Sequence, residues 1–94
     1  MFVTSDGHPG ARLQRALAVG NLTAAEQAAF EVAFVPLGQA RALVDLYAEH
    51  GDPKYERAAL KYLARYLTEG EPSLTDVAQM AALLAERSLI MRGL

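Results

Sequence analysis

Glycine and proline divide this chain into five segments, and this division constrains its fold more than any other feature. The breaks fall at Gly20-Asn21, Pro36-Leu37-Gly38, Gly51-Asp52 and Gly70-Glu71-Pro72. Regular structure tends to stop at such positions, because glycine and proline are poor helix formers and favour turns. The segments between the breaks are longer than a typical strand of about five or six residues. This spacing favours helices joined by short turns.

Apolar residues inside the segments recur at helical intervals. Leu60, Leu63 and Leu67 form one apolar stripe, and Leu43 and Leu46 share a face of the preceding segment. Ala and Leu together supply 32 of the 94 residues, whereas Val, Ile and Thr supply only 11, a ratio that favours helix over strand. The predicted fold class is therefore all-α, with about five helices in antiparallel hairpins, arranged as a small bundle or as a short helical-repeat array.

The helix boundaries follow from capping residues. Thr23 and Glu26 have the spacing of a capping box, Asp52 before Pro53 is typical of an N-cap with proline at the first helical position, and Ser73 begins a third such signal. The helices are expected over the following ranges: 10–19, 23–35, 39–50, 53–69 and 74–91.

A chain of 94 residues has the length of one domain. Residues 1–9 are interpreted as a loose N-terminal arm, and residues 10–94 as a single helical domain. The first ten residues lack the basic and apolar regions of a signal peptide, and no uncharged run approaches the roughly 20 residues needed to cross a bilayer. We therefore expect a cytoplasmic protein without a membrane partner.

The residue types limit the chemistry that the chain can perform. Without cysteine it has no disulfides, thiolate metal sites or cysteine nucleophiles. Glu49, His50 and Asp52 could in principle hold a metal, but an imidazole in the last turn of a helix is also explained by the helix dipole. Glu56 falls on the apolar side of its predicted helix, where the helix N-terminus favours a negative charge. We expect no catalytic residues, no metal and no cofactor; an enzyme using Glu56 or His50 is the least favoured alternative.

A short motif recurs in two of the segments. Glu26-Gln27-Ala28-Ala29-Phe30 is echoed 30 residues later by Glu56-Arg57-Ala58-Ala59-Leu60, and each copy follows a Gly-Asn or Gly-Asp break. Over residues 12–68 this pattern resembles the helix-turn-helix junction of tetratricopeptide repeats, although the Trp and the early Leu-Gly pair of that family are absent. The resemblance implies a helical hairpin array that binds peptides or proteins and performs no chemistry. A generic helical bundle remains the alternative.

The predicted helix 53–69 carries a basic face with adjoining tyrosines. Residues 53–67 have a net charge of +3 in a chain whose net charge is −2. This face is the candidate partner-binding surface, and its residues are Lys54, Arg57, Lys61, Tyr62, Arg65 and Tyr66. It would bind an acidic protein or, less favoured, nucleic-acid phosphates. The alternative is a solvated face whose tyrosines bury their rings and keep their hydroxyls in water.

A second candidate surface is apolar. The predicted helix 23–35 is apolar nearly all round, and such a helix must be covered on more than one side. We interpret the excess as a self-association surface, formed by Phe30 and Phe34 or by Leu83 and Ile90 near the C-terminus. The sequence therefore predicts a non-catalytic protein–protein interaction module, an adaptor or scaffold that forms a homodimer. The alternative is a small nucleic-acid-associated regulator that uses the basic and tyrosine face of the fourth helix.

Overall fold

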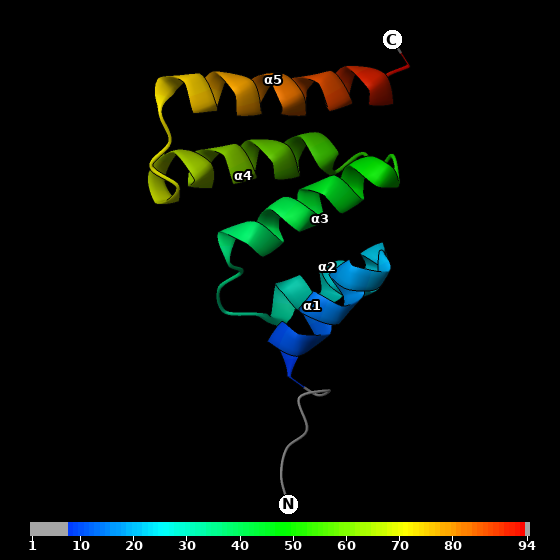
Figure 1. Cartoon of the computed structure of the whole chain (residues 1–94). Coiled ribbons are helices and arrows are strands. Elements are labelled where there is room, and N and C mark those ends of the chain that lie inside the picture. The colour runs from blue at the N-terminus through cyan, green and yellow to red at the C-terminus, as the bar shows by residue number, and fades with distance from the viewer. Residues whose placement is uncertain (1–7, 94) are drawn as a thin grey trace, which may run out of the picture. The chain divides into compact units, whose positions relative to one another are not determined.

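A computed structural model describes residues 8–93 of the chain, and residues 1–7 of the expected N-terminal arm lie outside that range. The described part contains five helices and no strand, and 78% of it is helical, which confirms the predicted all-α class (Figure 1). The helices are listed here with their bounds: α1 (Pro9–Val19), α2 (Leu22–Glu31), α3 (Leu37–Glu49), α4 (Tyr55–Glu69) and α5 (Leu74–Met91).

The chain forms two compact units, and the boundary between them falls inside α3, after Leu46. The first unit contains α1, α2 and most of α3. The second unit contains the end of α3 together with α4 and α5, which run antiparallel to each other (Figure 1). Whether residues 10–94 behave as one domain stays a prediction.

Two of the predicted helix ends are formed as expected. Ser73 accepts a hydrogen bond from the Asp76 N–H through its hydroxyl, while the Asp76 carboxylate accepts one from the Ser73 N–H, so this capping box opens α5. Gly20 ends α1 in the left-handed conformation, with φ of 74°. Helix α1 begins at Pro9, one residue before the predicted start, and the His8 imidazole accepts a hydrogen bond from the Gly10 N–H. His8 and Pro9 therefore belong to the start of a helix.

Two other caps differ from the prediction. The N-cap of α2 is Asn21, whose side-chain oxygen accepts a hydrogen bond from the Ala24 N–H, so Thr23 lies inside the helix. The Asp52 carboxylate accepts a hydrogen bond from the Lys54 N–H and its carbonyl accepts one from the Tyr55 N–H. Asp52 therefore stabilises a short turn ahead of α4, and Lys54 is the N-cap residue. Asn and Asp satisfy backbone donors equally well in turns and at caps, so their spacing alone does not separate the two.

Helix α2 ends at Glu31, four residues earlier than predicted. Val32 is extended, with φ of −81° and ψ of 134°, and the segment up to Pro36 is not helical. Proline disfavours helical conformation in the residue before it, and β-branched valines favour extended backbone. Val32 and Val35 pack against the core of the first unit from this extended segment. The apolar valines that suggested a longer helix therefore belong to an extended segment that packs against the core.

The core of the first unit is small and built around Leu13. It consists of five buried residues, Leu13, Ala16, Ala25, Ala28 and Leu46, and Leu17, Leu22 and Leu43 pack against it. Four of the five come from α1 and α2. Alanine on both facing helices allows close approach of the two backbones, so Leu13 fills most of the space between them.

The turn after α4 uses its glycine in an unexpected way. Gly70 has a negative φ of −85°, but a Cβ atom there would lie 2.9 Å from the Tyr66 carbonyl oxygen. The left-handed position is taken instead by Glu71, with φ of 47°. Gly70 is therefore required for close approach, and the conformation that favours glycine falls on the residue after it.

We expect Glu71→Gly to raise the free energy of unfolding by about 0.5–1 kcal/mol, because it relieves a left-handed conformation in a residue with a Cβ atom. Gly70→Ala is expected to lower it, since the added methyl collides with the Tyr66 carbonyl. Urea denaturation followed by circular dichroism measures both. Equal effects of the two substitutions would contradict this account of the turn.

Candidate interaction surface

An apolar groove lies between α4 and α5 in the second unit. The Tyr55 hydroxyl donates a hydrogen bond of 2.8 Å to the Leu84 carbonyl oxygen, which ties the start of α4 to the middle of α5. Beside this contact the two helices leave a groove of about 430 Å³. Its principal apolar lining residues are Ala59, Leu60, Leu63, Ala81, Ala85 and Leu89. A hollow of this size and lining can take apolar side chains.

Glu56 lies at one end of the groove. Its contacts with α5 and with the residue after that helix explain why a carboxylate occupies the apolar side of α4. Its Oε1 atom accepts hydrogen bonds from the Ser88 hydroxyl at 2.7 Å and from the Arg92 guanidinium at 2.8 Å. The hydrogen bond from Ser88 and the positive charge of Arg92 hold the pKa of Glu56 below its ordinary value of 4.5. Glu56 is thus an ionised carboxylate already bonded to α5, which makes it a weak proton acceptor near neutral pH.

The Glu56 contacts predict a pH dependence of stability. Because the pKa of Glu56 is lowered in the folded state, its contribution is present above 4.5 and is lost as the pH falls through the folded value. We expect the wild-type chain to have a higher melting temperature than Glu56→Gln at pH 7, with a difference that shrinks steadily below about pH 4.5. Thermal melts at several pH values test this. A difference that stays constant down to about pH 2 would contradict the assigned contacts.

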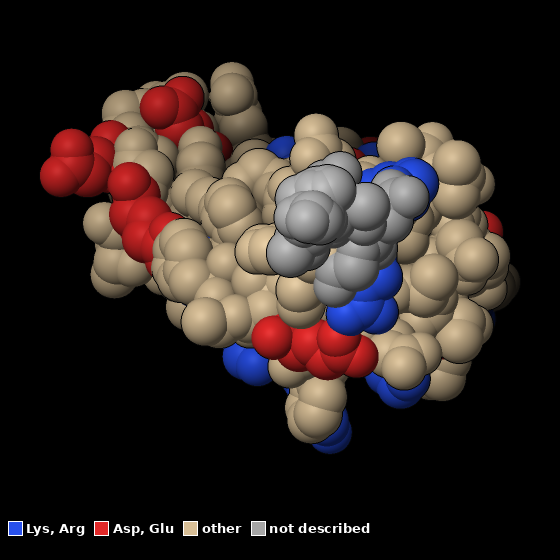
Figure 2. Space-filling view, turned by 90° about the horizontal axis from the view of Figure 1, so that it is seen from below, with Lys and Arg blue, Asp and Glu red and all other residues tan. Residues whose placement is uncertain are grey.

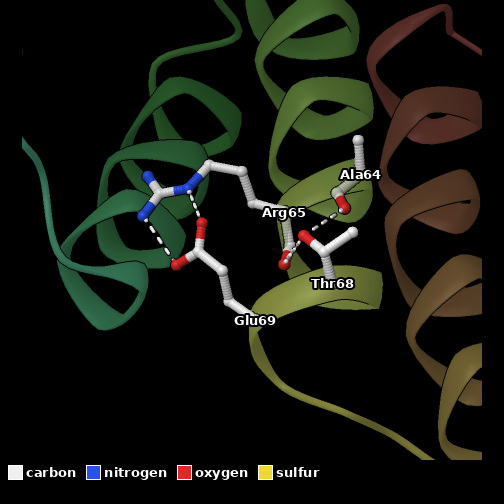
Figure 3. Close-up of polar contacts among 4 residues, drawn as sticks. All are labelled: Ala64, Arg65, Thr68 and Glu69. Carbon is white, nitrogen blue, oxygen red and sulfur yellow. Dashed lines mark hydrogen bonds and ion pairs between the residues drawn. The ribbon is translucent and has the colours of Figure 1, made fainter.

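The predicted partner-binding face of α4 is only partly open. Arg57 and Lys61 are exposed, and Lys54 is the exposed N-cap residue. Arg65 instead makes a two-pronged ion pair with Glu69, at 2.7 and 3.0 Å (Figure 3). The hydrogen bond from Arg65 lowers the pKa of Glu69, and that bond raises the pKa of Arg65. Arg65 is therefore half-buried and engaged within its own helix.

The tyrosines of this face do not all reach the surface. Tyr62 is 6% exposed, so little of its side chain is open to a partner in this conformation, and its role as a partner-binding residue stays a prediction. Tyr66 is half-buried, and its ring stacks on that of Tyr62 with centroids 6.0 Å apart. Tyr55 is also buried, and its hydroxyl is bonded to Leu84 rather than to water. The burial of the Tyr55 and Tyr62 rings agrees with the alternative interpretation of the face, but the Tyr55 hydroxyl is bonded to the protein rather than kept in water.

The four residues predicted for self-association are all exposed. Phe30 is 93% exposed on α2, and Phe34 lies in the extended segment after the end of that helix. The two phenylalanines therefore do not share the face of a single helix, as the sequence had indicated. Leu83 and Ile90 are seven residues apart on α5 and so share a face, but neither lines the groove. The structure thus places the four residues at three positions: Phe30 on α2, Phe34 after the end of α2, and Leu83 with Ile90 on α5.

Sequence reasoning missed the exposed leucines beside the groove. The sequence shows Leu60, Leu63 and Leu67 as one apolar stripe, and in the structure Leu60 and Leu67 are exposed, as are Leu74 and Leu89 on α5. Helical spacing identifies an apolar face and cannot say whether that face is covered. The only sequence signal of their exposure was that Lys61 and Ala64 lie between Leu60 and Leu67, which are seven residues apart.

The first unit has an open hollow of about 490 Å³, lined by α1 residues that include Arg12, by the N-cap residue Asn21 and by α2 residues that include Gln27. Arg12 forms an ion pair with Glu31. Figure 2 shows Lys and Arg in separate patches on the face in view, with Asp and Glu beside some of them.

Residues 8–93 contain neither a candidate metal cluster nor a candidate membrane-spanning helix. No group of three or more His, Asp or Glu side chains there is placed to hold a metal ion, and Glu49, His50 and Asp52 do not form one. No helix in the same range has the length and apolar character needed to cross a bilayer.

Comparison with family models, curated proteins and solved structures gives no match to this chain. The resemblance to tetratricopeptide repeats therefore rests on the residues quoted above.

Proposed function

We propose that this chain is a non-catalytic, cytoplasmic protein–protein interaction module, of the adaptor or scaffold type, that associates with a second copy of itself. The observation that carries the proposal is the amount of large apolar surface left open. Among the described residues, nine large apolar side chains are exposed, and six of them belong to α4 and α5: Leu60, Leu67, Leu74, Leu83, Leu89 and Ile90.

Single exposed apolar residues are ordinary, but contiguous ones mark interaction surfaces. Of the exposed leucines in α4 and α5, Leu60 and Leu89 line a groove together with further apolar side chains, so this part of the exposed apolar surface is contiguous. Helical hairpins of the tetratricopeptide type, which residues 12–68 resemble, also bind proteins. Both considerations support binding rather than chemistry.

A second candidate function is binding of an acidic protein to the basic face of α4. Arg57 and Lys61 support it, because both are exposed and lie four residues apart. Nucleic-acid binding has weaker support, since Glu69 pairs with Arg65 and removes one of four cations from the stripe. A salt titration separates these options, because phosphate binding weakens steeply as salt rises.

Self-association is tested by light scattering on the whole chain from about 1 to about 100 µM, a range that brackets affinities typical of weak homodimers. We expect the mean mass to rise toward twice that of the 10.1 kDa monomer as concentration increases. A mass that stays at the monomer value over the entire range would remove self-association from the proposal.

A further inference from the structure

We propose that the groove face of α4 and α5 is the homodimer interface, and that the two copies pack on it head to tail about a two-fold axis. The groove face is defined here by Leu60, Leu63, Leu67, Leu74, Ala81, Ala85 and Leu89. This inference rests on the proposed self-association and deepens it by naming the surface and the orientation of the partner.

The groove face is a continuous apolar strip along the hairpin. Leu60 and Leu89 line the groove and are 62% and 48% exposed. Leu67 lies seven residues after Leu60, and Leu74 lies seven residues before the groove residue Ala81, so each continues the same helix face two turns further. Leu74 is 85% exposed. The strip therefore extends from the Glu56 end of the hairpin to the turn between the helices.

The two ends of the hairpin carry opposite charge. Because α4 and α5 run antiparallel, Arg87 of α5 and its C-cap residue Arg92 come near the start of α4, as the contact between Glu56 and Arg92 shows. This open end holds four basic side chains and three carboxylates, a net charge of +1: Lys54, Arg57, Arg87 and Arg92, with Asp52, Glu56 and Glu86. The turn end holds one basic side chain and three carboxylates: Arg65, with Glu69, Glu71 and Asp76.

This charge polarity selects a second copy as the occupant. In a head-to-tail pair, the basic end of each hairpin meets the acidic turn of the other, and the two-fold axis makes this contact twice. A head-to-head pair would bring like charges together at both ends. A nucleic acid would match the basic end but would be repelled by the turn, and it would leave the apolar strip uncovered.

The middle of the groove face can be buried without isolating a charge. Its defining residues are all uncharged, and Glu56 and Arg92 at its border are already paired with each other at 2.8 Å. Burial of an unpaired charge is strongly unfavourable, whereas this pair keeps its hydrogen bonds within one copy. Two copies can therefore close over the leucines with the charged groups left at the rim.

The interface is tested with single charged substitutions compared by analytical ultracentrifugation. Leu89→Glu and Leu60→Glu, from the two helices, are each expected to raise the dimer Kd at least tenfold. Ile90→Glu is the matched control, since Ile90 is the next residue and is 68% exposed but does not line the groove. Phe34→Glu is the control for the first unit. Both controls should leave the Kd within about twofold, and circular dichroism confirms the helicity of every variant.

The orientation is tested with introduced thiols, which are unique because the chain contains no cysteine. Arg57→Cys and Glu71→Cys mark the basic end and the turn, because Arg57 is an exposed residue in the first turn of α4 and neither residue belongs to the groove face. With a short bis-maleimide, the head-to-tail pair is expected to crosslink in a mixture of the two variants and not in either one alone. Crosslinking of each variant with itself would instead show a head-to-head pair and overturn the assigned orientation.

The outcomes separate this inference from the proposed function. If the wild-type chain is a dimer, and Ile90→Glu or Phe34→Glu dissociates it while Leu60→Glu and Leu89→Glu do not, the groove face is not the interface. That result overturns this inference and leaves self-association intact. A wild-type monomer at all concentrations overturns both. Because the crosslinking arm keeps every groove leucine, it decides the orientation even where a glutamate variant fails to fold.

Discussion

Replacement of Tyr55 by alanine is expected to lower the free energy of unfolding by about 3–5 kcal/mol, as large aromatic-to-alanine substitutions in cores do. Tyr55 is 2% exposed, and it is among the largest fully buried side chains in the described part of the chain. Its ring fills the space between the start of α4 and α5, and its hydroxyl donates to the Leu84 carbonyl oxygen. The substitution removes the ring and the hydrogen bond together.

Tyr55→Phe separates these two losses. The ring is retained, so we expect a smaller decrease of about 0.5–1.5 kcal/mol, the net value of one hydrogen bond. Urea denaturation monitored by far-ultraviolet circular dichroism measures both variants. If Tyr55→Phe cost as much as Tyr55→Ala, the hydroxyl rather than the ring would hold α4 on α5, and the packing argument would be wrong.

Leu13→Ala is expected to cost about 2–5 kcal/mol, the range for leucine removal from a core. Leu13 has 0% exposure, and its neighbours in the first core are mainly alanines of α1 and α2. Alanine side chains are short and cannot move into the space that the leucine leaves. The cost should therefore lie toward the upper part of that range.

Val19→Ala provides the matched control for Leu13→Ala, because it lies on the same helix and is 73% exposed. We expect a change within about 0.5 kcal/mol for this surface position. Denaturation of the whole chain measures both. A Leu13→Ala loss of less than about 1 kcal/mol would mean that the first core is not packed around this leucine.

The sequence alone was sufficient to predict the helical class and most of the breaks. Both follow from local physics: glycine and proline stop helices wherever they occur, and the Ser73 and Asp76 capping box closes within four residues. The end of α2 was predicted too late because its last apolar residues are placed by the core. Val32 and Val35 pack there from extended backbone, and the local signals, two valines and a following proline, do not by themselves fix the residue at which the helix ends.

For the candidate sites, the sequence grouped residues by type and spacing but could not assign their surroundings. The spacing of the basic residues of α4 shows that they share a face. The burial of Tyr62 depends on packing between helices, and the ion pair of Arg65 with Glu69 depends on their side-chain rotamers. Glu56 was correctly singled out as unusual. Its partners Ser88 and Arg92 lie 32 and 36 residues away, beyond the reach of a helical wheel.

What the sequence determined by itself is local: where helices begin and stop, which residues share a helix face, and which chemistries lack their residues. Only the tertiary structure decided which of those faces are covered. Leu60 and Leu13 are both leucines at helical spacing, but one is 62% exposed and the other is fully buried. The physical reason is that burial depends on the neighbours that the folded chain brings to a residue, and those neighbours are set by contacts between segments far apart in sequence.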